Sequence, residues 1–258
     1  MGAREQRLVF GEVAGAYDDV RAGYPAVIAE RIFGYVGGPA PVVEVGAGTG
    51  KATAVFVAAG VPVTCVEPDP AMAAVLAGRF GGRVRLEVRG FEDWPPPAGG
   101  VPLICSAQAW HWVDAARRWR LASAALAPGG VLALFGHEYR LADPVFGAEV
   151  RALYGRLAPD LVGDDDDEGS TDPRAGWFHV EMAGCGLFDG VESSLVESVV
   201  DYPAARYRAL LDTFSPHRML ADGARGELLG AVEAAADRRG GVVAVRLVTT
   251  LTMGRRLR

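Results

Sequence analysis

Short apolar runs alternate with amphipathic stretches through residues 40–140 of the chain. The runs are rich in Val, Ile and Leu and are bounded by Gly and Pro, which indicates buried strands, whereas the stretches between them have helical periodicity. Strands are predicted over 42–45, 61–67, 84–88, 101–106 and 131–135, and helices over 51–60 and 114–127. This alternation predicts an α/β fold with a doubly wound sheet.

The flanking segments predict further elements on both sides of this region. Aromatic and aliphatic residues at spacings of three, four and seven in residues 1–40 predict two amphipathic helices, and Pro25 suits the first turn of the second. Beyond residue 140, helices are expected over 145–157, 202–214 and 227–239, and strands over 187–200 and 242–253. The acidic run 163–170 predicts an exposed loop, with a metal site the weaker alternative.

Three glycines at alternate positions close the first predicted strand. The sequence Glu44-Val45-Gly46-Ala47-Gly48-Thr49-Gly50 leads directly into a predicted helix. Glycine tolerates positive φ and lets a ligand approach bare main chain, where the unpaired N–H groups of a helix N-terminus can meet it. The spacing fits neither a dinucleotide fingerprint nor a phosphate loop, and an ordinary strand-to-helix turn is the alternative interpretation.

Composition excludes several classes of partner. The 258 residues carry a net charge of −6 with a pI near 5.3, and Lys51 is the only lysine, so a nucleic-acid partner is not expected. Cys65, Cys105 and Cys185 have no metal or redox spacing and suggest a reducing compartment. Without a signal segment or an apolar run of membrane length, we expect a cytoplasmic protein with no membrane association.

The glycine turn resembles motif I of the class I S-adenosylmethionine-dependent methyltransferases, in the form Glu44-x-Gly46-x-Gly48-x-Gly50. The segment LAPGGVLAL (126–134) is similar to a further motif of this family, and the segment AQAWHWVD (107–114) resembles the small-molecule subgroup related to trans-aconitate methyltransferases. The resemblance implies a Rossmann-like sheet of seven strands. It also implies one methyltransferase domain over 1–258, with an N-terminal helical cover (1–40), a cofactor-binding core (41–140), a cap insertion (141–185) and a part that completes the sheet (186–258).

The implied cofactor is S-adenosylmethionine, with S-adenosylhomocysteine as the product. Glu67 follows Gly50 by 17 residues at the end of the second predicted strand, where a carboxylate can accept hydrogen bonds from both ribose hydroxyls. A solvated strand-end glutamate is the alternative, and the N-terminal aromatic residues also suit packing. The resemblance predicts these cofactor-binding residues: Tyr17, Arg21, Glu44, Gly46, Ala47, Gly48, Glu67, Pro68, Met72, Phe91, Glu92 and Gln108.

The implied reaction is methyl transfer to a small-molecule acceptor, with secondary metabolism as a setting. Trp110, Trp112, His137 and Tyr139 are expected to bind the acceptor, and Asp114 is expected to cap the next helix. His111 is the candidate catalytic residue, as a positioning group or a base, although a core histidine bonded to backbone is an equal alternative. No metal site is expected. The rival function is a protein of this fold that binds the cofactor without transferring its methyl group.

Overall fold

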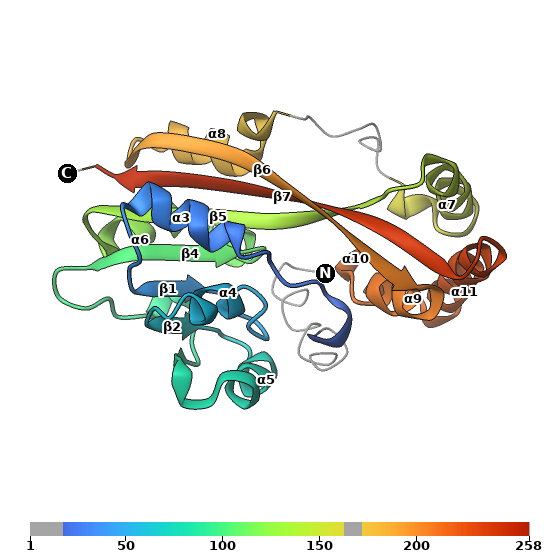
Figure 1. The fold of residues 1–258 in the computed structure, drawn as a ribbon, viewed down its shortest axis with the longest axis horizontal. Coiled ribbons are helices and arrows are strands. Elements are labelled where there is room, and N and C mark those ends of the chain that lie inside the picture. The colour runs from blue at the N-terminus through green and yellow to red at the C-terminus, as the bar shows by residue number, and fades with distance from the viewer. Residues whose placement is uncertain (1–17, 163–171, 258) are drawn as a thin grey trace. The chain divides into compact units, whose positions relative to one another are not determined.

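The computed structural model describes residues 18–162 and 172–257, and seven strands form one sheet in the order β3-β2-β1-β4-β5-β7-β6 (Figure 1). The predicted seven-stranded α/β fold is confirmed. The strands are β1 (Val42–Val45), β2 (Val63–Val66), β3 (Arg85–Glu87), β4 (Val101–Ala107), β5 (Leu126–Leu141), β6 (Phe188–Pro203) and β7 (Val242–Arg256).

Helices lie between most of the strands. The α-helices are α3 (Val27–Val36), α4 (Thr53–Ala58), α5 (Pro70–Phe80), α6 (Arg118–Ala125), α7 (Pro144–Leu157), α8 (Trp177–Gly184), α9 (Ala204–Asp212), α10 (Ser215–Arg218) and α11 (Asp222–Arg238). The 3₁₀ turns are η2 (Gly81–Arg83), η3 (Phe91–Asp93), η4 (Trp110–Trp112), η5 (Pro159–Leu161) and η6 (Pro173–Ala175). None of the helices in the described residues is both long and apolar enough to cross a membrane.

Strand β1 lies between β2 and β4, and all four of its residues are buried. It pairs in parallel with both neighbours, so that Glu44 is opposite Cys65 on one side and Cys105 on the other. Parallel strands covered on both faces read as continuous apolar runs, which explains the sequence VVEV and the burial of both cysteines. The carboxyl ends of β1, β2 and β4 therefore meet at one edge, where the glycine turn begins.

Local sequence signals explain where several helices begin and end. Asp69 caps α5, and its carboxylate accepts hydrogen bonds from the N–H groups of Ala71 and Met72, while Pro70 occupies the first helical position. Asp143 and Pro144 begin α7 in the same way. Helix α3 starts at Val27, two residues after Pro25, and ends at Gly37 in the left-handed conformation that favours glycine.

The described chain divides into two compact units. The sheet unit comprises residues 23–137, 172–196 and 249–257, and the helical unit comprises 18–22, 138–162 and 197–248. The strands β5, β6 and β7 contribute residues to both units. The segment 141–185, expected as one cap, supplies α7 to the helical unit and α8 to the sheet unit, so its role as a cap stays a prediction.

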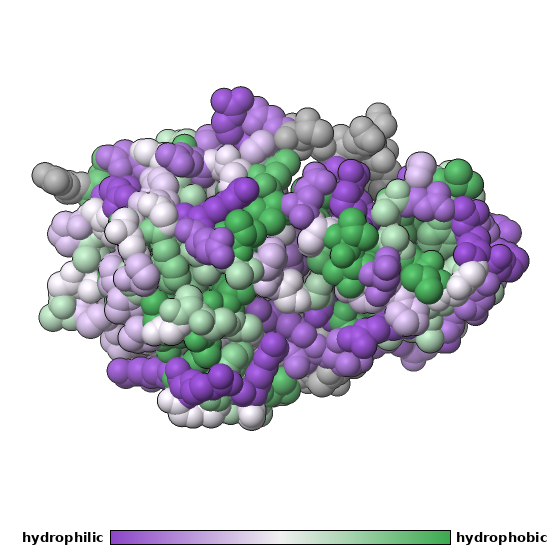
Figure 2. All heavy atoms as spheres, viewed as in Figure 1, coloured by the Kyte–Doolittle hydropathy of each residue, from purple (hydrophilic) through white to green (hydrophobic). Residues whose placement is uncertain are grey.

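Each unit has its own core. In the sheet unit, side chains of β1, β2, β4 and β5 pack with α3, α4 and α5 on one face and with α6 and α8 on the other. In the helical unit, α7, α9 and α11 pack around Leu210, Leu228 and Val232, all fully buried. On the face shown in Figure 2, hydrophilic and hydrophobic residues are interspersed over the surface.

Several predicted boundaries were wrong, and α11, for example, begins at Asp222 rather than at residue 227. Helix α6 begins at Arg118 rather than Asp114, and Asp114 does not cap it; its carboxylate accepts from the Ala116 N–H at 2.9 Å. Strand β5 begins at Leu126 rather than Val131, and its register with β4 shifts, since Val101 pairs with Leu126 and Leu103 with Val131. The four residues 127–130 therefore form an irregular insertion in a longer strand.

Candidate functional site

The three glycines of the turn have different surroundings although all have positive φ. A Cβ atom on Gly46 would lie 2.3 Å from the Cβ of Ala109, and one on Gly50 would lie 2.4 Å from the Phe80 ring. A Cβ on Gly48, at φ +57°, would meet no atom within 4 Å. Gly46 and Gly50 are thus required by packing, whereas Gly48 presents bare backbone to open space that a ligand can fill.

Glu67 supports this turn from the neighbouring strand. Its Oε2 accepts from the Gly48 N–H at 2.7 Å and its Oε1 accepts from the Asp69 N–H at 2.9 Å. Glu67 is buried, so its carboxylate, which has little contact with solvent, lies next to Gly48 in the turn. This is where the sequence predicted a group that holds ribose hydroxyls.

Glu44 lies fully buried beneath the turn. Its Oε2 accepts a 2.6 Å hydrogen bond from the hydroxyl of Thr53, in the first turn of α4. Burial raises the pKa of Glu44 to about 8, against the opposing effect of the Thr53 hydrogen bond. Because the side chain is enclosed, Glu44 supports the turn from within, and its predicted contact with the cofactor stays a prediction.

Thr49, between Gly48 and Gly50, carries a polar group whose partner is missing from the described protein atoms. Its side chain is 1% exposed, and its hydroxyl has no hydrogen-bond partner there. A buried hydroxyl without a partner is costly, because it has lost water and gained nothing in return. In this conformation the hydroxyl is enclosed by protein atoms, with less than 1 Å² exposed, so neither a water nor a ligand atom has room beside it.

Gln108 directly follows β4 and has a strained backbone conformation. At φ 54° it is the one non-glycine residue with positive φ in the described parts of the chain. Its side-chain Nε2 donates to the His137 carbonyl at 2.6 Å, and its backbone N–H donates to the Phe135 carbonyl at 2.9 Å. Such strain persists where surrounding contacts fix it, and it is concentrated at functional sites.

The segment after Gln108 brings two rings to the surface and buries a third. His111 is exposed and Trp112 half-buried, with ring centroids 4.5 Å apart. Partial desolvation lowers the pKa of His111, and the nearby charge of Arg118 lowers it further. Trp110 is fully buried against Phe91 and Trp119, so in this conformation it belongs to the core and offers no surface to an acceptor.

The residues expected around the adenine lie on two short elements. Met72 is buried on α5, whereas Pro68 is exposed before it. Phe91 is buried against Trp94 and Trp110, and Glu92 accepts from the Asp114 N–H at 2.9 Å. The loops after β3 and β4 are thereby joined, and the contact of these residues with an adenine remains a prediction.

The remaining predicted residues are spread over the two units. Ala47 is buried in the sheet-unit core. Arg21 and Tyr139 belong to the helical unit, where Arg21 donates to the Thr213 hydroxyl at 2.8 Å and lies over the Phe214 ring at 4.0 Å. Tyr139 packs edge-on against Phe214. Tyr17 lies outside the described residues.

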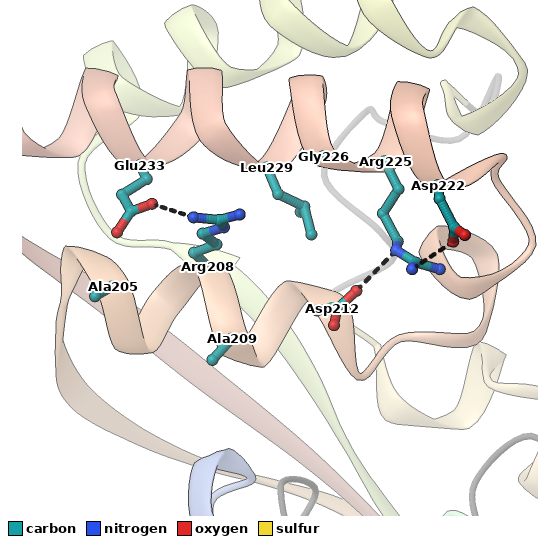
Figure 3. Close-up of a pocket in the computed structure, with 9 residues that line it drawn as sticks. All are labelled: Ala205, Arg208, Ala209, Asp212, Asp222, Arg225, Gly226, Leu229 and Glu233. Carbon is teal, nitrogen blue, oxygen red and sulfur yellow. Dashed lines mark hydrogen bonds and ion pairs between the residues drawn. The ribbon is translucent and has the colours of Figure 1, made fainter. Parts of the chain in front are cut away.

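The helical unit contains a groove of about 470 Å³ lined by α9 and α11 (Figure 3). Its charges are paired across the two helices: Arg208 contacts Glu233 at 2.9 Å, and Arg225 contacts Asp212 at 3.1 Å. Ala205, Ala209, Gly226 and Leu229 also line it. None of the residues predicted from the sequence lines this groove.

Three supporting residues were not among the predicted site residues. Asp69 was recognisable, because an Asp before a Pro at the start of a helical pattern is a cap signal. Thr49 and Thr53 had no such signal, since a threonine in a loop or helix is common. In the described residues, no cluster of His, Cys, Asp and Glu has the form of a metal site.

Comparison with known proteins gives matches to the part of the chain that contains the glycine turn. Residues 42–130 match the family described as a methyltransferase domain. An uncharacterized methyltransferase of Mycobacterium tuberculosis is 37% identical over 134 residues, which are 51% of this chain. The aligned part covers only 53% of that relative. The likeness to trans-aconitate methyltransferases stays a prediction.

Solved structures share the fold. A protein from Anaeromyxobacter dehalogenans, provisionally named a type II methyltransferase, aligns with a TM-score of 0.64 at 24% identity, covering 92% of this chain and 98% of its own. Haemonchus contortus phosphoethanolamine N-methyltransferase 2 aligns with a TM-score of 0.56 at 13% identity, covering 100% of this chain and 61% of its own. The chain therefore has the Rossmann-like α/β fold of methyltransferases, with residues 42–130 matching their domain family.

Proposed function

We propose that the protein is an S-adenosylmethionine-dependent methyltransferase acting on a small-molecule acceptor. The observation that supports this most directly is the pairing of the open Gly48 with the Glu67 carboxylate, 2.7 Å from its N–H, in a region that matches a methyltransferase domain. Haemonchus contortus phosphoethanolamine N-methyltransferase 2 has been solved with S-adenosylmethionine and with S-adenosylhomocysteine, which makes this cofactor the natural candidate here.

The turn has the groups that such a cofactor needs. Glu67 would accept from the ribose hydroxyls, and Gly48 would admit the ligand against its backbone. Met72 and Glu92 would contact the adenine, and Gln108 would face the methionine portion. The cofactor supplies a methyl group already activated on a sulfonium, so the protein mainly aligns the acceptor and excludes water.

His111 and Trp112 would contact the acceptor at the methyl-transfer side of the site. We assign His111 a positioning role first, in which the imidazole holds a polar group of the acceptor. The lowered pKa of His111 keeps its ring neutral near pH 7, so it can also take a proton from a hydroxyl acceptor. A small acceptor and a role in secondary metabolism belong to this proposal.

The deciding experiment is a turnover assay with purified protein, S-adenosylmethionine and a panel of small hydroxyl, amine, thiol and carboxylate compounds. Formation of S-adenosylhomocysteine together with a methylated acceptor is the expected result. Calorimetric titration with S-adenosylhomocysteine runs in parallel. Binding without turnover on any acceptor would favour a cofactor-binding protein that transfers no methyl group, and absence of binding would overturn the proposal.

A further inference from the structure

His137 was expected to contact the acceptor, but both of its ring nitrogens already have partners within the sheet unit. Nδ1 lies 2.7 Å from the Thr249 hydroxyl of β7, and Nε2 lies 3.1 Å from the Gly23 carbonyl. A carbonyl can only accept, so Nε2 carries a proton and donates it to Gly23. In the neutral ring, Nδ1 then accepts from the Thr249 hydroxyl.

The ring is also held on its face. Tyr24 stacks on the imidazole with centroids 4.0 Å apart and an interplanar angle of 18°, and it also packs edge-on against Phe135 at 4.8 Å. His137 itself is 6% exposed. These contacts make His137 the point at which the Gly23–Tyr24 segment attaches to β5 and β7.

The backbone of His137 also contacts the segment that follows β4. Its carbonyl accepts the side-chain hydrogen bond of Gln108, the residue held at positive φ. Gly136, next to it, is required there, because a Cβ would lie 2.9 Å from the Cγ of Gln108. The same two residues of β5 therefore hold the start of the segment Gln108–Trp112, which we call the acceptor loop.

We propose that His137 is a positioning residue that fixes the Gly23–Tyr24 segment through its ring and the acceptor loop through its carbonyl. A shift of the ring therefore changes the place of both segments together. The consequence for methyl transfer rests on the proposed function, since the acceptor loop carries His111 and Trp112. The contacts themselves can be tested without any ligand.

The test compares two threonines of β7 that are both fully buried and three residues apart. Thr249→Val removes the hydroxyl that contacts His137, whereas Thr252→Val removes one that contacts Ser193 at 2.8 Å. Both variants lose one buried hydroxyl, so their loss of stability should be similar. Only the bond lost in Thr249→Val reaches His137; the bond lost in Thr252→Val reaches Ser193, which also contacts His179 at 2.9 Å.

Hydrogen exchange measured by mass spectrometry on the ligand-free protein is the first measurement. For Thr249→Val we expect roughly five- to tenfold faster exchange in residues 23–28 and in the acceptor loop, the scale of one lost hydrogen bond. For Thr252→Val we expect neither change. Equal effects of the two variants, or faster exchange in only one of the two segments, would overturn the proposal.

Variants of His137 give a second test if Thr249→Val does not fold. His137→Gln retains a donor for the Gly23 carbonyl, and His137→Phe retains the stacking on Tyr24 but no ring hydrogen bond. In His137→Gln we expect residues 23–28 to exchange at the wild-type rate, and in His137→Phe we expect them to exchange faster. Faster exchange in His137→Gln than in His137→Phe would contradict the assigned role.

Affinity for S-adenosylhomocysteine then separates the two proposals. Thr249→Val should bind it at least threefold more weakly than Thr252→Val if the fixed segments serve the cofactor site. If the wild type binds S-adenosylhomocysteine and both variants bind it equally well, the positioning role of His137 in the cofactor site is contradicted. A wild type that binds no S-adenosylhomocysteine would instead overturn the proposed function and leave the exchange result to decide the role of His137 in fixing the two segments.

Discussion

The Glu67 carboxylate accepts a hydrogen bond from the Gly48 N–H at 2.7 Å, which joins the end of β2 to the open middle of the glycine turn. Glu67→Ala removes this support and the proposed ribose partner together. We expect affinity for S-adenosylhomocysteine to fall by about 1.5–3 kcal/mol, the scale of hydrogen bonds to a charged group, and calorimetric titration measures it.

Glu87→Ala is the matched control for Glu67→Ala. Glu87 ends the neighbouring strand β3, and its side chain pairs with Arg85 and Arg89. Its backbone carbonyl accepts from the Glu67 N–H at 3.0 Å, and Glu87→Ala keeps that bond. Removal of the Glu87 side chain should leave affinity unchanged. A folded Glu67→Ala variant that binds as tightly as Glu87→Ala would remove the ribose assignment.

Gly48→Val tests the open space beside the turn. A branched side chain there would occupy the place of the ligand, and positive φ in a β-branched residue costs about 1–2 kcal/mol. We therefore expect a folded protein, somewhat less stable, that no longer binds S-adenosylhomocysteine. Circular dichroism and titration measure the two effects separately.

Gly99→Val is the control for Gly48→Val, because it also places a β-branched residue at positive φ but at a position outside the glycine turn. Gly99 has φ +87°, and a Cβ there would also meet no atom within 4 Å, but the residue lies in the loop before β4. The variant should lose similar stability and keep its affinity. Wild-type binding by Gly48→Val would place the cofactor away from this turn.

We expect the raised pKa of Glu44 to lower the free energy of unfolding as pH rises. Burial raises its pKa to about 8, so the folded protein keeps a proton that the unfolded chain releases above about pH 4.5. Stability from this group is therefore present at pH 5 and falls toward pH 8, by on the order of 3 kcal/mol. The groups that interact with this carboxyl group are Thr53, Glu67, Cys65 and Cys105.

Glu44→Gln isolates this effect, because it is neutral at every pH and can still accept from Thr53. Urea unfolding at pH 5 and pH 8 should show a smaller decline for the variant than for the wild type. Parallel declines would mean that Glu44 does not hold its proton in the folded state.

We expect the lowered pKa of His217 to have the opposite effect at acidic pH, so that the free energy of unfolding falls as pH falls. Burial lowers its pKa to about 4, although Asp212 opposes the shift, and its Nε2 lies 2.6 Å from the Tyr154 hydroxyl. The unfolded histidine gains a proton below about pH 6.5, so stability falls as pH drops from 6.5 toward 4, by on the order of 3 kcal/mol. Thermal unfolding of His217→Gln should show a flatter slope over that window; an unchanged slope would assign the acid loss to other groups.

The sequence was most informative where backbone needs are strict. Gly46 and Gly50 were identifiable because a turn at positive φ tolerates few alternatives, and Glu67 because it ends an apolar run at a fixed distance from them. The parallel pairing of β1 with β2 and β4 agrees with the alternation of strands and helices in the sequence. Such features depend on local chemistry that one sequence displays.

Side-chain direction was not predictable in the same way. Trp110 and His137 lie in segments that reach the carboxyl ends of the strands, yet Trp110 packs inward on Trp119 and His137 bonds to Thr249, 112 residues later. Long-range partners of this kind leave no periodic signal. The longer β5 was missed for a related reason, because a Pro-Gly-Gly turn in sequence is an irregular insertion in the strand.

The last prediction concerns His111, whose exposed ring lies beside Trp112 and near the charge of Arg118. His111→Asn keeps a hydrogen-bonding group but no useful base, and His111→Ala keeps neither. If His111 positions the acceptor, Asn retains much of the turnover and Ala does not. If it is a base, both variants lose roughly 10²–10⁴-fold in the transfer step.

Single-turnover kinetics with an acceptor found in the panel assay, compared over pH 5–8, separates the two roles. A base gives a rate that rises with pH through the lowered pKa of His111 and a variant that lacks this rise. A positioning group gives the same pH profile in the wild type and in Asn. Because His111 is exposed, neither variant should lose much stability. Full turnover by His111→Ala would contradict both roles and leave Trp112 as the remaining candidate on this loop.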